Sequence, residues 1–139
     1  MQILRDQAAV LSAIESWSDI AMCQLLTERL AFYAEYEDLK LSELFKLIFI
    51  EPGDTLEELD AEFNGAFLIN HYSGRRLGDD GFRPCFETLE EHPTFYDMVF
   101  CEGDAGFCVE VIVPKTDGID GRLLNLCAQF ATEAPGISP

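Results

Sequence analysis

Cationic side chains are scarce in this sequence. Nine lysines and arginines stand against 26 aspartates and glutamates among 139 residues, which gives a formal net charge of −17. No lysine or arginine occurs at positions 47–74 or 84–114. Neutralising phosphates requires clustered Lys and Arg side chains. The sequence therefore argues against direct binding to DNA or RNA, and against binding to an anionic membrane.

Long apolar runs are also lacking. The longest nearly apolar stretch, residues 44–50 (LFKLIFI), contains Lys46 and is far shorter than the ~20 residues that span a bilayer. The first residues (MQILRD) lack the basic start and the apolar stretch of a secretory signal. We therefore expect a cytoplasmic protein without a transmembrane segment.

Motifs for cofactors, metals and covalent catalysis are missing as well. No GxSxG, P-loop or GxGxxG pattern is present. The two histidines, His71 and His92, do not stand at zinc-ligand spacing from a cysteine or from each other. We predict no metal, no cofactor and no catalytic residue, so a binding protein is a better hypothesis than an enzyme.

The cysteines show no pattern of a disulfide framework. They are odd in number, no two form a CxxC pair, and several have apolar neighbours. Free cysteine is among the most buried residue types, so we expect reduced side chains that serve as small core residues. The five are Cys23, Cys85, Cys101, Cys108 and Cys127.

The apolar content is sufficient for one folded domain, because 48% of the residues are hydrophobic and the length is typical of a single domain. Apolar residues at helical spacing predict helices over residues 5–17 and 19–37. Further along the chain, the patterns predict a buried strand at 44–50, a short helix at 55–63, a weaker strand at 66–70, a helical turn at 86–91, a hairpin of strands 95–101 and 107–113, and a helix from 120 onward.

This order of elements predicts one α+β domain over residues 1–139, with a frayed C-terminal tail. Strands joined by hairpins favour an antiparallel sheet of about four strands. We expect the two N-terminal helices, the short middle helix and the C-terminal helix to pack on one face of that sheet.

Acidic residues concentrate on the short middle helix and around the hairpin. An acidic field of this kind favours a basic protein partner, whose approach it would accelerate. The partner could be a nuclease, a DNA-binding protein or a toxin, and this chain would act as a nucleic-acid mimic or as an immunity or antagonist protein. Plain solubility explains the same charge without any partner. The residues predicted to form the acidic face are Glu57, Glu58, Asp60, Glu62, Glu87, Glu90, Glu91, Glu102 and Asp104.

Residues 71–86 read as a long loop that is rich in glycine and charge, and long loops often carry function. The loop holds three of the nine cations, and guanidinium groups can bind a carboxylate or phosphate through paired hydrogen bonds. The alternative function is therefore the binding or conversion of a small anionic ligand. Its candidate residues are His71, Tyr72, Arg75, Arg76 and Arg83. A third alternative is an acidic chaperone for a secreted effector, which would need an exposed apolar groove.

Overall fold

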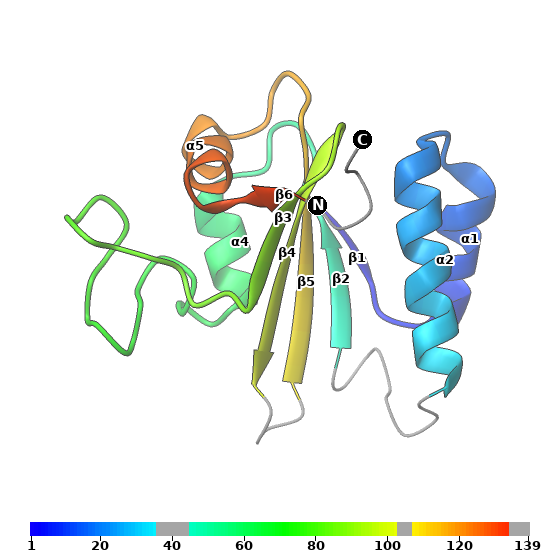
Figure 1. The fold of residues 1–139 in the computed structure, drawn as a ribbon, viewed down its shortest axis with the longest axis horizontal. Coiled ribbons are helices and arrows are strands. Elements are labelled where there is room, and N and C mark those ends of the chain that lie inside the picture. The colour runs from blue at the N-terminus through cyan, green and yellow to red at the C-terminus, as the bar shows by residue number, and fades with distance from the viewer. Residues whose placement is uncertain (36–44, 103–106, 134–139) are drawn as a thin grey trace.

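A computed structural model describes the chain over residues 1–35, 45–102 and 107–133. Its centre is a mixed six-stranded sheet in the order β1-β2-β5-β4-β3-β6 (Figure 1). The pairs β2–β5 and β3–β6 are parallel, and the other neighbours are antiparallel. The strands are β1 Gln2–Leu4, β2 Phe45–Phe49, β3 Thr88–Glu91, β4 Phe95–Glu102, β5 Phe107–Pro114 and β6 Thr132–Glu133.

Helices cover both faces of the sheet, so the molecule has three layers (Figure 1). Helices α1 (Gln7–Ser16) and α2 (Ile20–Glu35) lie on one face, and α4 (Leu56–Glu62) and α5 (Gly121–Phe130) lie on the other. The α+β class and the central hairpin are confirmed. The expectation of a purely antiparallel sheet with helices on one face is wrong.

Strand β2 shows why helices pack on both faces of the sheet, because its segment has apolar side chains on both sides. Leu47 and Phe49 pack in the core beneath α1 and α2, whereas Ile48 and Ile50 pack in the core beneath α4 and α5. All four are buried because β2 lies inside the sheet, between β1 and β5. A nearly continuous apolar run is typical of such a two-sided strand, and the prediction of a buried inner strand is confirmed.

Two other predicted elements differ from the structure. Residues 66–70 form no strand, and only an isolated bridge joins Ile69 to Arg76. The helical turn expected at 86–91 is instead strand β3, which pairs with β4. A tight turn closed by the hydrogen bond from the backbone N–H of His92 to the carbonyl of Phe95 (2.8 Å) brings these strands together. Strand pairing across that turn overrides the weak local helical pattern.

Side-chain oxygen atoms cap the N-termini of helices α1 and α4. Asp6 accepts a hydrogen bond from the backbone N–H of Ala9 (2.7 Å) at the start of α1, and Thr55 accepts one from Glu58 (3.1 Å) at the start of α4. Such caps satisfy backbone donors that have no partner within the helix. None of the helices among the described residues is both long and apolar enough to cross a membrane.

Asp120 connects the starts of α4 and α5. Its Oδ1 accepts from the backbone N–H of Arg122 (3.0 Å), and its Oδ2 accepts from the backbone N–H of the fully buried Leu56 (3.0 Å). Hydrogen bonds from the Arg122 side chain are the main cause that lowers the pKa of Asp120 to about 2. One carboxylate therefore fixes both helices of this layer.

We predict that Asp120→Ala lowers the free energy of unfolding by about 2 kcal/mol, because it leaves buried and helix-terminal donors without an acceptor. Urea denaturation at pH 7 measures this loss. Asp117→Ala, an exposed acid in the same loop, is the matched control and should change stability by less than about 0.5 kcal/mol. Since the folded-state pKa of Asp120 is lowered, its contribution is present above the ordinary pKa and disappears as the pH falls toward about 2. Equal losses in the two variants would contradict the assigned role.

Candidate functional site

The exposed acids of α4 are Glu57 and Glu58. Glu57 is engaged by Arg122, whose two terminal nitrogens each donate to one carboxylate oxygen at 2.7 Å. This contact is the main cause that lowers the pKa of Glu57. The side chain of Glu58 has no ion pair within the described part of the chain. Glu58 is therefore the predicted acid of this helix that is available to a partner.

The other two acids predicted on α4 have structural roles. Asp60 Oδ1 accepts from the backbone N–H groups of Phe67 and Leu68, both at 2.9 Å, and so holds the following segment against the helix. Glu62 forms an ion pair with Lys46 at 3.2 Å. Neither carboxylate is free to stand in for a phosphate.

The acids predicted around the hairpin are dispersed. Glu87 is exposed, and Glu91 pairs with Lys115 at 2.7 Å. The side chain of Glu102 and the whole of Asp104 lie outside the described residues. Glu90, the remaining member, follows Leu89, which packs in the core beneath α4 and α5, so Glu90 belongs to the opposite sheet face, which α1 and α2 cover.

A different acidic surface exists where the segments 51–58 and 117–122 meet. The backbone N–H of Gly53 donates to the carbonyl of Gly118 (3.1 Å). Gly118 has φ +90°, and a Cβ there would lie 2.9 Å from Cβ of Pro52, so glycine permits this close approach. We call the resulting surface the acidic end. Its carboxylates are Glu51, Asp54, Glu57, Glu58, Asp117 and Asp120.

The residues of the predicted ligand loop lie on the protein surface. His71, Tyr72, Arg75, Arg76 and Arg83 are all exposed. The Arg75 guanidinium donates to a backbone carbonyl of its own loop (2.7 Å). Arg83 instead lies over two aromatic rings, with its guanidinium carbon 5.2 Å and 5.8 Å from their centroids.

A hollow of about 770 Å³ lies between residues 77–83 and α5. Arg83 and Arg122 line it together with Asp79 and Asp80, so its charges of opposite sign balance. Of the five predicted loop residues, Arg83 alone reaches it. The hollow beside the predicted loop therefore carries charges of both signs.

The structure also contains a cluster of polar side chains between α2 and the sheet, which we call the polar cluster: Arg29, Glu90, His92, Asp97 and Glu110. Asp97 on β4 and Glu110 on β5 are 2% and 0% exposed, and they are the buried charged residues among those described. Arg29 reaches from α2 to Glu110, with its Nε 2.6 Å from Oε1 and its Nη2 2.8 Å from Oε2. The same Nη2 lies 3.3 Å from Asp97 Oδ2.

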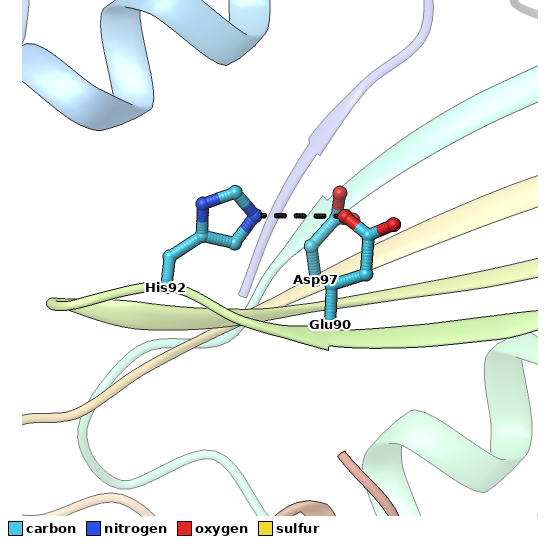
Figure 2. Close-up of side chains that lie close together, drawn as sticks. All are labelled: Glu90, His92 and Asp97. Atoms are coloured by element: carbon cyan, nitrogen blue, oxygen red, sulfur yellow. Dashed lines mark ion pairs between the residues drawn. The ribbon is translucent and has the colours of Figure 1, made fainter. Parts of the chain in front are cut away.

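His92 completes this cluster from the turn after β3. Its ring stacks on Phe95 with the centroids 4.3 Å apart, and its Nε2 faces the carboxylates of Glu90 and Asp97 (Figure 2). The distance from Nε2 to Glu90 Oε2 is 4.0 Å. Two buried atoms, His92 Nε2 and Asp97 Oδ1, have no hydrogen-bond partner within the described residues.

Burial sets the protonation states in the polar cluster. Removal from water, followed by the neighbouring Glu110 carboxylate, raises the pKa of Asp97 far above its ordinary value. Removal from water also lowers the pKa of His92, against the opposing effect of Glu90. Burial therefore favours the uncharged forms of both Asp97 and His92 in this cluster. Chemically, the cluster can hold a proton or a metal cation.

Of the polar cluster, Glu90 is the one member among the site residues that the sequence predicts. Asp97 and Glu110 each interrupt an apolar strand, in FYDMVF and in VEVIV, and that interruption is a signal that the sequence contains. A charged residue in a buried strand needs a specific partner. The partner itself, Arg29, is 68 and 81 positions away, and no local pattern indicates it.

Comparison with protein-family models, curated proteins and solved structures finds no match. The proposals below therefore rest on the contacts, burial and charge of this chain.

We predict that Asp97→Asn makes the free energy of unfolding less dependent on pH. Because the folded-state pKa of Asp97 is raised, its stability contribution is full below the ordinary pKa of 3.8 and is lost as the pH rises above it. The wild-type slope from this group is at most about 1.4 kcal/mol per pH unit, and asparagine removes it. Urea denaturation from pH 4 to 8, in buffer with a chelator, measures both slopes. Glu15→Gln, an exposed acid on α1, is the control and should leave the slope unchanged. Parallel profiles for the wild type and Asp97→Asn would contradict the assignment of the proton.

Proposed function

We propose that this protein is a non-enzymatic binding module that engages a basic protein through the acidic end. The observation that carries the proposal is that two distant segments, which meet at the Gly53–Gly118 hydrogen bond, carry six carboxylates. Four of these, on Glu51, Glu57, Glu58 and Asp117, are exposed. Within the described residues, their cationic partners are Arg122 and the Met1 amino group. The surface therefore keeps a net negative charge after its internal ion pairs are counted.

The distribution of the cations also supports a basic partner. Lys46 and Lys115 are paired with acids on the protein surface, and Arg29 is paired beneath α2. Arg83 is stacked on aromatic rings. These side chains form no basic patch that could neutralise a run of phosphates. The surface charge thus favours a partner that is itself cationic.

The partner we infer is a nuclease, a DNA-binding protein or a toxin, because the Lys and Arg side chains of such proteins bind phosphate groups or carboxylates in their place. Glu58 and Asp117 would stand in for phosphates, since both are exposed and have no ion pair among the described residues. Occupation of a nucleic-acid groove would inhibit such a partner. Salt weakens interactions between exposed charges, so the association should be salt-sensitive.

The test is affinity capture from a lysate of the source organism at low salt, followed by elution with rising salt. We expect a basic protein to elute at moderate salt, and we expect Glu58→Gln with Asp117→Asn to weaken its binding about tenfold. Glu15→Gln with Glu28→Gln removes the same charge from exposed positions on α1 and α2, and is the matched control. Equal capture by both double variants, or no captured protein, would contradict the proposal.

The alternative function, binding of a small anion at the hollow, has less support. Arg122 is held by Glu57 and Asp120, and Arg83 is stacked on rings. Asp79 and Asp80 line the same hollow and would repel an anion.

A further inference from the structure

Two buried polar atoms in the polar cluster lack hydrogen-bond partners within the described residues. They are His92 Nε2 and Asp97 Oδ1, and both belong to side chains directed at one point together with the Glu90 carboxylate (Figure 2). Leaving one buried donor or acceptor unsatisfied costs about 1–3 kcal/mol, and buried polar groups are normally paired. A group bound between these two atoms would give both of them a partner.

We propose that Glu90, His92 and Asp97 bind one divalent transition-metal ion of the Zn²⁺ class. One ligand atom from each residue lies within 4.8 Å of the other two. Ligands bound to zinc at about 2.0–2.2 Å stand roughly 3–4 Å apart, so the three side chains need to move inward by about 1 Å. Glu90 can supply most of this movement, because its side chain is long and 28% exposed.

Charge balance supports a dication at this place. The carboxylates of Glu90 and Asp97 carry two negative charges when both are ionised, which a divalent ion neutralises. Since burial of an uncompensated carboxylate is costly, a cation bound between these groups is favourable.

The surroundings hold the ligands in place. The second oxygen of Asp97, Oδ2, lies 3.3 Å from Arg29 Nη2, which leaves Oδ1 to face the ion. The ring of His92 is fixed by stacking on Phe95. Outer contacts of this kind orient metal ligands and strengthen binding. The His92 and Glu90 side chains are 18% and 28% exposed, so the cluster lies near the protein surface, although His92 Nε2 itself is buried.

The donor set selects the class of ion. Calcium takes six to eight oxygen ligands, and magnesium prefers oxygen ligands and retains several waters. A neutral imidazole nitrogen with two carboxylates suits zinc, and leaves an open coordination position when three protein side chains bind. The site lies on the sheet face opposite α4 and is independent of the acidic end.

The experiment titrates the full chain, stripped with a chelator and kept reduced, with Zn²⁺ by calorimetry and with Co²⁺ by absorption spectroscopy. We expect one ion per chain and Co²⁺ bands in the visible range. His92→Phe keeps a ring to stack on Phe95 but removes the nitrogen, and should lower the affinity at least about a hundredfold. His71→Phe, at the other histidine, is the matched control and should bind as the wild type does.

Glu90→Gln tests the same site without altering a buried residue, and should also lower the Zn²⁺ affinity. Several results would overturn the proposal. They are unchanged binding in His92→Phe and Glu90→Gln, an equal loss in His71→Phe, displacement of Zn²⁺ by equimolar Mg²⁺, or the near-ultraviolet thiolate bands that indicate cysteine ligands. Capture of a basic protein by the acidic end is expected in all three variants, so this site and the proposed function can fail separately.

Discussion

The burial of Glu110 is the constraint on which the packing of α2 against the sheet depends. Its carboxylate is fully inaccessible in the middle of the sheet, and Arg29 reaches it from α2 with two hydrogen bonds. Removing one member of such a pair leaves an uncompensated buried charge, which is far more costly than lacking both. The pair therefore fixes the position of α2 over β4 and β5, and it places the guanidinium where it also contacts Asp97. This ion pair thus sets the place of Arg29 in the polar cluster.

The strands were predictable where the pattern of apolar residues within one segment is sufficient to identify them. The run at 44–50 predicts β2, and alternating apolar residues with a glycine-containing connection predict the pair β4–β5. Strand β3 was not predictable in this way, because Leu89 is its one buried residue and a single buried position gives no repeating pattern. The parallel pairing of β2 with β5 joins segments about sixty residues apart, and no local feature of either strand specifies it.

The candidate site was less predictable than the fold, because residues of the same type have different roles in the structure. Glu58 and Asp60 are two positions apart on one helix, yet the first is exposed and the second accepts two backbone hydrogen bonds. Counting acids along the sequence cannot separate these roles. In the polar cluster, Glu90 lies opposite Asp97 through the register of β3 and β4, and the sequence alone does not fix that register.

The acids of this chain thus act through two different physical effects. Exposed carboxylates such as Glu58 remain solvated, so each contributes little to stability and the group contributes a long-range field that salt screens. Buried carboxylates have lost their water, so each requires a specific compensating group: a guanidinium for Glu110, and a proton or a cation for Asp97. The field can attract any basic surface and specifies its partner weakly, whereas the buried cluster selects by distance and donor type. The net charge of −17 reflects the field of the exposed acids, but it gives no information about the buried ones.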